Sequence, residues 1–312
     1  KEAGRVLGIP ERSVLIGSTG VIGMQIPMDR VKKGIAELAS STAETLEAGE
    51  AASRAIMTTD THNKQAAVSL ELSGKTVTLG GMSKGSGMIH PGMCTMLAFL
   101  TTDAAIEKEL LQKAVSEVVN ETFNMISVDG DMSTNDTLLV LANGLAGNEE
   151  IREENEAYEA FKEALFFVCR ELAMEMAGDG EGATKLIESQ VVHADTKEHA
   201  RILAKAVIQS NLTKAAIFGK DANWGRVLCA LGYSGVSFDP EKVDLYFEAD
   251  GKKMLIFTDG SAADYSEEEA AELLGSSKVV ILSDMHMGEE AATAWGCDLT
   301  YDYVKINADY RS

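Results

Sequence analysis

The sequence predicts a layered α/β fold, and not a Rossmann sheet, for this chain of 312 residues. Apolar residues recur at helical spacing in some stretches and alternate with polar residues in others. These helical and strand-like stretches follow one another without a strict strand–helix–strand rhythm, which a doubly wound parallel sheet would require. A chain of this length, 45% hydrophobic, is long enough to bury a large core in one or two domains.

Helices are expected wherever apolar side chains fall three or four residues apart. In residues 27–40, Val31, Ile35 and Leu38 share one face, and Pro27 and Asp29 suit a helix start. Residues 1–9 resemble the end of a helix. A helix through Ile106, Leu110, Ala114 and Val118 is expected to begin at a cap on Thr102 or Asp103. Further helices are expected at 158–172, with a stop at Gly178-Asp179-Gly180, and at 196–209, 222–231 and 267–274.

Two hairpins are expected from alternating β-rich runs that meet at a turn. One spans residues 68–79 around Ser73-Gly74, and the other spans 244–257 around Asp250-Gly251, a dipeptide typical of tight hairpin turns. Residues 279–282 predict a short buried strand. The charged run at 149–159 is interpreted as a solvated helix face.

The acidic balance excludes some classes of partner. With 49 acidic and 28 basic residues the formal net charge is −21, which disfavours nucleic acid and anionic membranes. No apolar run is long enough to span a bilayer and no signal peptide is visible, so we expect a cytoplasmic protein. The abrupt start suggests a missing N-terminal portion.

The four cysteines, Cys94, Cys169, Cys229 and Cys297, fit no zinc-binding spacing. Cys169 and Cys229 lie in apolar helical stretches, so we expect both to be buried free thiols in a reducing compartment.

The strongest chemical signal is in residues 84–103, KGSGMIHPGMCTMLAFLTTD. A glycine-rich segment leads to Cys94-Thr95 and then to an apolar run. Thr95 could simply pack at a turn. Alternatively, its hydroxyl attacks the preceding carbonyl and shifts the acyl group from nitrogen to oxygen, which releases a new N-terminal threonine.

Such a threonine carries its own base. The reference pKa of an α-amine is near 8, and the amine is close enough to accept the hydroxyl proton during attack. A positive charge on Lys84 would keep more of that amine neutral, or would pair with a substrate carboxylate, and these two uses are compatible.

This segment resembles the cleavage site of the glutamate N-acetyltransferase and ornithine acetyltransferase (ArgJ) family, which typically reads KGSGMIAPNMATMLAF. Here His90, Gly92 and Cys94 replace Ala, Asn and Ala, while the threonine and the lysine eleven residues before it are kept. The resemblance implies cleavage between Cys94 and Thr95, with Thr95 as the nucleophile.

A second segment, IGSTGVIG at residues 16–23, resembles the family's STGVIG loop. The resemblance implies that Thr19 offers its hydroxyl and Gly20 its backbone N–H to the developing oxyanion. Without the resemblance, the segment would be a glycine turn or a phosphate loop, although the GxxxxGK[ST] spacing of a phosphate loop is absent.

Substrate contacts are implied at several further positions. The segment MTTDT at 57–61 places one on Thr58, and GDGEGATK at 178–185 places one on Glu181, a carboxylate suited to an ammonium group. Without the resemblance, the latter stretch would be only a helix stop. Lys84 and Thr95 are also implied to contact substrate. The end of the chain, KINADYRS, resembles KINADYRT and implies contacts on Asn307 and Ser312, whose serine keeps the hydroxyl and the chain-end carboxylate.

Other matching segments have no clear catalytic role. SVDGDMSTNDT at 127–137 and GKDANWGR at 219–226 are expected to shape the pocket, although Asn135, Asp136 and Asp221 could equally be structural. ATAWGCDLTY at 294–303 is expected in the core and in subunit packing. His90 is nearest the nucleophile in sequence, but the family pattern has no histidine there, so we interpret it as a bystander.

The resemblance covers the whole chain and implies a layered α/β/β/α fold of the DmpA/ArgJ-like type, with an N-terminal nucleophile. It implies an α fragment, here residues 1–94, and a β fragment, 95–312, that form one intertwined unit and an (αβ)₂ heterotetramer. The family's own N-terminal segment would precede Lys1.

The implied reaction of arginine biosynthesis moves acetyl from N-acetylornithine to glutamate through acetyl-Thr95, releasing ornithine, without metal or cofactor. Acetyl-CoA is a further donor in some members. The alternatives are an amidase or aminopeptidase, in which water resolves the acyl-enzyme, and an uncleaved, non-catalytic fragment.

Overall fold

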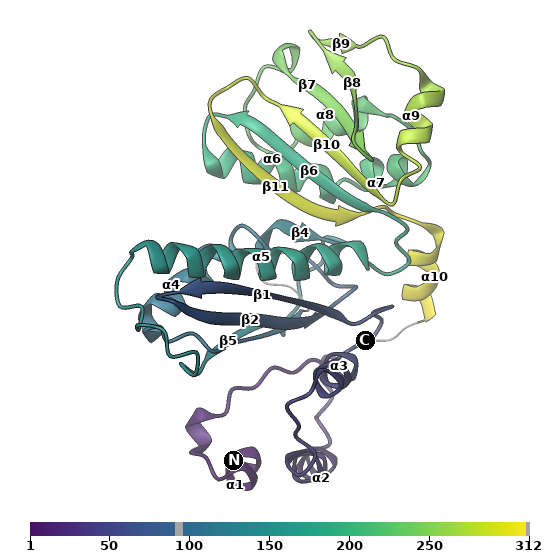
Figure 1. Cartoon of the computed structure of the whole chain (residues 1–312). Helices are drawn as coiled ribbons and strands as arrows, with labels where there is room; N and C mark the ends of the chain where they lie inside the picture. The colour runs from purple at the N-terminus through teal and green to yellow at the C-terminus, as the bar shows by residue number, and fades with distance from the viewer. Residues whose placement is uncertain (91–95, 310–312) are drawn as a thin grey trace.

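The computed structural model describes residues 1–90 and 96–309 and contains two β-sheets with helices layered against them. Figure 1 shows the long helix α5 between the two sheets, and α6 and α8 beyond the second sheet. The predicted layered α/β architecture, without a Rossmann sheet, is confirmed. Over the described residues the layers run four-stranded sheet, α5, seven-stranded sheet, and then α6 to α8.

The four-stranded sheet is mixed and has the order β1-β2-β3-β5. Its first two strands form the predicted hairpin, in which Ser73 (φ 52°) and Gly74 (φ 69°) take the left-handed conformation of a tight turn. The strand β3 pairs antiparallel with β2 and parallel with β5. The bounds are β1 Lys64–Leu72, β2 Lys75–Lys84, β3 Leu97–Thr102 and β5 Thr137–Ala142.

The seven-stranded sheet has the order β4-β11-β6-β10-β7-β8-β9 and is also mixed. Its β7–β8 hairpin turns at Asp250 (φ 49°) and Gly251 (φ 77°), as predicted, and the predicted buried strand is part of β10. The bounds are β4 Ile126–Ser127, β6 Leu186–Ala194, β7 Asp244–Ala249, β8 Lys252–Thr258, β9 Ser261–Ala262, β10 Lys278–Asp284 and β11 Glu290–Cys297.

The helix α5, Glu156–Gly178, is apolar on most of its surface because it contacts a sheet on each side. Asn155 caps its start by accepting from the N–H groups of Ala157 and Tyr158, and the helix ends at the predicted glycine. The other helices of this part are α4 Lys108–Val119, α6 Lys197–Gln209, α7 Asn211–Phe218, α8 Trp224–Gly232, α9 Glu267–Leu273 and α10 Tyr301–Asp309, with short 3-10 turns at Phe123–Met125 and Pro240–Lys242.

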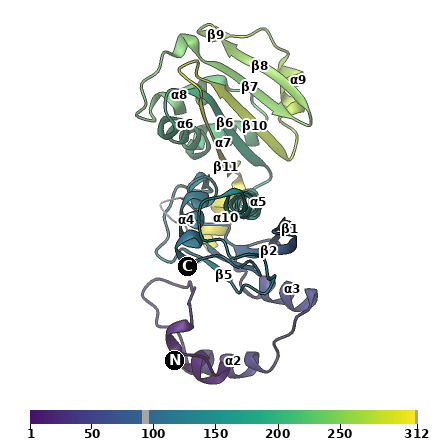
Figure 2. The same cartoon turned by 60° about the vertical axis from the view of Figure 1, so that its left-hand side comes forward.

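The N-terminal part lies beyond the four-stranded sheet, on the side away from α5, in both views (Figures 1 and 2). It contains α1 Glu2–Leu7, the 3-10 turn Glu11–Ser13, α2 Met28–Ala39 and α3 Leu46–Ala55. The predicted helix end is confirmed in α1, which stops at Gly8 in the left-handed conformation.

The start predicted for α4 was wrong. The helix begins at Lys108, and neither Thr102 nor Asp103 caps it. Both side chains are engaged with the neighbouring strand instead: the Thr102 hydroxyl donates to the carbonyl oxygen of Thr78, and Asp103 accepts from the Thr78 N–H. Because both side chains bond to β2, neither caps the start of α4.

The burial predicted for Cys229 was also wrong, whereas that of Cys169 is confirmed. The α8 helix buries Val227, Ala230 and Leu231, which leaves Cys229 on the exposed face. Among the described residues, no helix has the length and apolar character that a membrane crossing needs.

Candidate active site

One pocket of about 400 Å³ collects side chains from the whole length of the described chain. Every predicted site residue that the structure describes lines it: Thr19, Gly20, Thr58, Lys84, Glu181 and Asn307. The remaining predicted site residues, Cys94, Thr95 and Ser312, lie outside the described residues. Positions nearly three hundred residues apart in sequence thus meet around one cavity.

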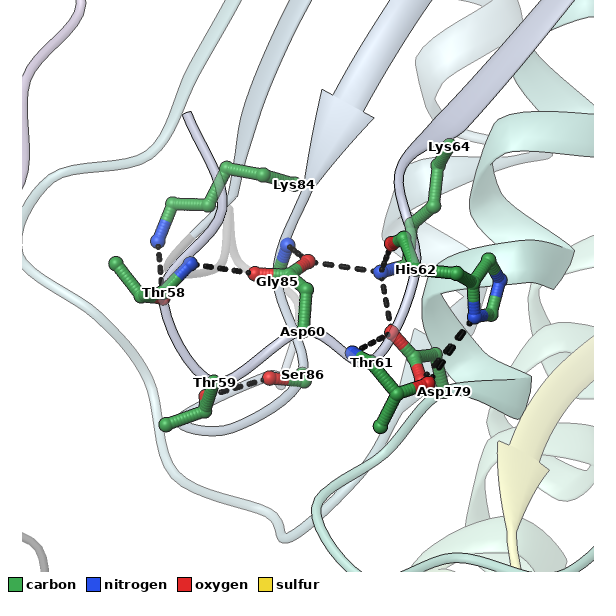
Figure 3. Close-up of polar contacts among 10 residues, drawn as sticks. All are labelled: Thr58, Thr59, Asp60, Thr61, His62, Lys64, Lys84, Gly85, Ser86 and Asp179. Carbon is green, nitrogen blue, oxygen red and sulfur yellow. Dashed lines mark hydrogen bonds and ion pairs between the residues drawn. The ribbon is translucent and has the colours of Figure 1, made fainter. Parts of the chain in front are cut away.

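The sheet register relates this pocket to the predicted cleavage segment. The last residue of β2, Lys84, pairs with Leu97 at the start of β3, two positions after Thr95 in sequence. Lys84 is buried, and its Nζ donates to the Thr58 hydroxyl at 3.3 Å (Figure 3). Burial lowers the pKa of Lys84, and although Asp60 and Asp136 oppose this, the neighbouring Lys64 reinforces it.

A buried ion cluster, Asp60–Lys64–Asp179, underlies the pocket (Figure 3). The Lys64 Nζ lies 2.7 Å from Asp60 Oδ1 and 2.6 Å from Asp179 Oδ2, and the Lys64 side chain is fully buried. A buried charge must be paired and hydrogen-bonded to be tolerated. Burial alone would raise the pKa of Asp60, but hydrogen bonds from Lys64 and from two backbone amides outweigh it and lower that pKa.

This cluster positions the residues that line the pocket. Asp60 accepts from the N–H of Thr58 at 3.0 Å and from the N–H of Gly85 at 2.7 Å. Asp179 accepts from the N–H and the hydroxyl of Thr61, which ties the end of α5 to the start of β1. The segments that carry Thr58, Lys84 and Glu181 are therefore joined through one buried lysine.

Glu181 lines the pocket between the segment after β2 and α10. Its backbone N–H donates to the Ser86 carbonyl at 2.8 Å, and its carboxylate accepts from the Asn307 amide at 2.8 Å. Gly87 approaches this carboxylate closely: a Cβ at that position would lie 2.5 to 2.6 Å from the Glu181 carboxylate atoms. Any side chain at position 87 would therefore require the Glu181 carboxylate to move.

The predicted oxyanion-hole segment reaches the pocket by packing on β3. Gly17 lies against the ring of Phe99, where a Cβ would come within 2.9 Å of the ring. Thr19 and Gly20 then line the pocket. Within the described residues, neither the Thr19 hydroxyl nor the Gly20 N–H has a hydrogen-bond partner. Both residues carry donors of the kind that stabilise an oxyanion, and both line the pocket.

The segment 127–137 does line the pocket, as predicted, through residues that include Asp129, Asp131 and Asn135. Asp129 fixes the segment after β2 by accepting hydrogen bonds from the N–H groups of Met88 and Ile89. Asp136 accepts at 3.1 Å from the N–H of Met96, the residue after Thr95. Burial raises the pKa of Asp136 to about 6, against the effects of the Met96 N–H and of Lys84.

Three other expectations have different outcomes. The segment 219–226 was wrongly predicted to shape the pocket: it connects α7 to α8, and none of its residues is among those lining the cavity. His90 also lies outside the described lining, and its Nδ1 is 3.3 Å from both the Ser127 hydroxyl and the Gln209 amide. The first part of the segment 294–303 is core, as expected, with Ala294, Trp295 and Cys297 buried, whereas Tyr301 and Asp302 at the start of α10 are exposed.

Sequence reasoning missed the roles of Asp60, Lys64 and Asp179. Asp60 and Asp179 lie inside the two segments that carry Thr58 and Glu181. That position is a signal from which a supporting role for both carboxylates could have been predicted. Nothing in the local pattern reveals Lys64, because its pairing with Asp179 spans 115 residues. Tyr303, which also lines the pocket, was expected only in the core or in subunit packing.

The chain was compared with known protein families and sequences. The ArgJ family model matches residues 1–312. The chain is 52% identical over 312 residues to the arginine biosynthesis bifunctional protein ArgJ of Caldanaerobacter subterraneus subsp. tengcongensis, covering all of this chain and 77% of that protein. It is 55% identical over 310 residues to the protein of the same name from Symbiobacterium thermophilum, covering 99% and 76%.

A solved structure is also similar. The crystal structure of arginine biosynthesis bifunctional protein ArgJ from Bacillus halodurans superimposes with a TM-score of 0.65 at 46% identity, covering 68% of this chain and 98% of that one.

Proposed function

Because the chain belongs to the ArgJ family, we propose that it is an acyltransferase of arginine biosynthesis that moves an acetyl group from N-acetylornithine to glutamate through an acetyl-Thr95 intermediate. The observation that carries the proposal is the single pocket, which collects all six described residues that the family resemblance assigned to catalysis or substrate binding. The names of the relatives, which include arginine biosynthesis, support the pathway.

The proposed enzyme cuts itself between Cys94 and Thr95. The four-stranded sheet supports the idea that both products stay together, because β1 and β2 belong to the proposed α fragment, 1–94, and β3 and β5 to the β fragment, 95–312. The β2–β3 ladder pairs Leu79 through Lys84 with Thr102 through Leu97 and would join the fragments after cleavage. We further propose assembly into an (αβ)₂ heterotetramer in the cytoplasm.

In the first half-reaction, the Thr95 hydroxyl oxygen forms a bond to the acetyl carbon, and its proton moves to the threonine's own α-amine. The carbonyl electron pair moves onto oxygen, where the Thr19 hydroxyl and the Gly20 N–H stabilise it. Collapse of this intermediate breaks the C–N bond, and the departing ornithine nitrogen takes the proton back. The amine of glutamate then attacks acetyl-Thr95 in the same way and leaves as N-acetylglutamate.

The charges around the pocket suit these substrates. Glu181, held by Asn307, faces the cavity as a carboxylate acceptor for the free ammonium of N-acetylornithine. Lys84, which also lines the pocket, provides a donor for the carboxylate that ornithine and glutamate share. Thr58, already hydrogen-bonded to Lys84, and the serine at the chain end complete the proposed contacts.

Replacing Glu181 by glutamine is expected to raise the KM for N-acetylornithine by about tenfold or more, because a hydrogen bond to a charged group is lost while the shape is kept. Steady-state kinetics measure this. Glu71→Gln is the matched control: it makes the same change at an exposed carboxylate on β1 and should leave KM unchanged. Equal KM values for Glu181→Gln and the unmodified enzyme would remove Glu181 from the substrate site.

Gly87→Ala is expected to lower kcat/KM by about 10- to 100-fold, because a Cβ would push the Glu181 carboxylate out of position. Gly49→Ala on α3 is the control, since a Cβ there meets nothing within 4 Å. Kinetics of both variants, with circular dichroism to confirm folding, check the prediction. Unchanged kinetics in Gly87→Ala would show that Glu181 is free to move.

The test of the proposed function is a product assay with N-acetylornithine, with and without glutamate. A transferase forms N-acetylglutamate and ornithine together and needs glutamate for turnover, whereas an amidase releases acetate in its absence. The word bifunctional in the relatives' names supports a second activity, for which we propose acetyl-CoA as the donor. Replacing N-acetylornithine by acetyl-CoA in the same assay tests that part separately.

A further inference from the structure

A group of metal-ligating side chains lies in the seven-stranded sheet, among residues that do not line the pocket. His193, Asp284 and His286 each offer one ligand atom, and these three atoms lie within 4.8 Å of one another. His193 is near the end of β6, Asp284 ends β10, and His286 follows two residues later. We propose that these residues form a zinc-binding site with three protein ligands, at which water completes the coordination.

The distances fit such a site. Asp284 Oδ1 lies 2.8 Å from His193 Nδ1 and 3.5 Å from His286 Nδ1, so one carboxylate oxygen faces both imidazoles. Zn–N and Zn–O bonds of about 2.1 Å in a tetrahedron place ligand atoms about 3.4 Å apart. The two observed separations lie on either side of that value, so small side-chain rotations would admit the ion.

An outer carboxylate orients one of the ligands. Asp244 Oδ2 lies 2.9 Å from His286 Nε2, the nitrogen on the far side of the ring from Asp284. Asp244 itself accepts from the Thr258 hydroxyl at 2.6 Å. A proton on Nε2 leaves the Nδ1 lone pair of His286 directed at the proposed ion. Metal-binding histidines commonly donate their second nitrogen to a carboxylate in this way.

Backbone hydrogen bonds join the segments that contain the three proposed ligands. The strands β6, β10 and β7 are neighbours, and the register places Asp284 opposite Asp244. The carbonyl of His193 accepts from the N–H groups of Met287 and Gly288, which fixes the segment around His286 against β6. Both histidines have φ near +50°, which non-glycine residues rarely adopt. The two imidazole rings are stacked, with centroids 6.2 Å apart.

The side chains are also accessible. About half of each histidine side chain is exposed, while Asp284 and Asp244 are mostly buried. An ion can therefore arrive from solvent and keep water as its remaining ligand. Imidazole and carboxylate together suit zinc among the biological divalent ions, whereas calcium and magnesium prefer oxygen alone.

The test is calorimetric titration of the full chain with ZnCl₂ in about 0.15 M salt, which screens weak binding to scattered surface carboxylates. The Cys229→Ser background removes an exposed thiol that would also bind zinc. We expect one strong equivalent per chain, lost in His193→Ala/His286→Ala. Asp244→Asn should keep the stoichiometry and weaken affinity by about 10- to 100-fold. His199→Ala is the matched control, because His199 on α6 pairs with Asp195, just before that helix, and belongs to no three-residue ligand group among the described residues.

Thermal unfolding with and without ZnCl₂ gives a second readout. Zinc should raise the Tm of the parent chain but not of the double histidine variant, whose metal-free Tm shows that it folds. Binding that is equally tight in the parent and in the double variant would overturn the proposal, and so would the absence of a strong equivalent in the parent.

Discussion

Thr95→Ala is expected to leave the chain in one piece and to lower kcat for acetyl transfer by at least about a thousandfold. The variant lacks the hydroxyl that attacks the preceding carbonyl, so no new N-terminus forms and neither nucleophile nor α-amine base is created. Mass spectrometry of the denatured protein checks cleavage, and the transfer assay checks activity.

Thr95→Ser is the matched control, because serine keeps the hydroxyl and differs by one methyl group. We expect it to be cut and to retain measurable transfer. If Thr95→Ala is cut at the same bond, then cleavage does not use this side chain, and the proposed self-processing is wrong.

Lys64→Met is expected to destabilise the fold by about 3–5 kcal/mol, because it leaves Asp60 and Asp179 buried without the cation between them. The same change releases the anchor of Thr58 and Gly85 and should remove most of the activity. Urea unfolding followed by circular dichroism measures the first effect, and the transfer assay measures the second.

The control is Lys33→Met, whose exposed pair with Glu37 on α2 is expected to contribute less than about 1 kcal/mol. Adding Asp179→Asn to Lys64→Met removes one of the two uncompensated charges and should recover part of the lost stability. An unfolding midpoint for Lys64→Met equal to that of Lys33→Met would show that the cluster does not support the site.

Local rules predicted the parts of the fold whose contacts are local. Both hairpins were found because Ser73-Gly74 and Asp250-Gly251 adopt the turn that their residue types favour. The start of α4 was misplaced because Asp103 accepts from Thr78, a residue 25 positions earlier. The burial of Cys229 was misjudged because apolar neighbours on a helix do not reveal which face packs against the sheet.

In the candidate site too, the residues within recognisable segments were predicted and those that depend on long-range contacts were not. Thr58 and Glu181 were predicted from segments that resemble the family, and the structure brings them to one pocket. The buried partner of Asp179 was not predicted, because no spacing rule connects it to Lys64 across the chain. The His193, Asp284 and His286 group also depends on strand order, since His193 lies on β6 whereas Asp284 and His286 lie at or just after the end of β10.

The central claim is that the acetyl group passes through Thr95. Incubating the protein with N-acetylornithine without glutamate, followed by acid quenching and peptide mass spectrometry, tests it most directly. The account predicts a fragment that begins Thr95-Met96-Leu97 and carries one additional acetyl group, which is lost when glutamate is added before quenching. An unmodified Thr95 fragment, from a preparation that produces N-acetylglutamate at the normal rate when both substrates are supplied, would contradict it.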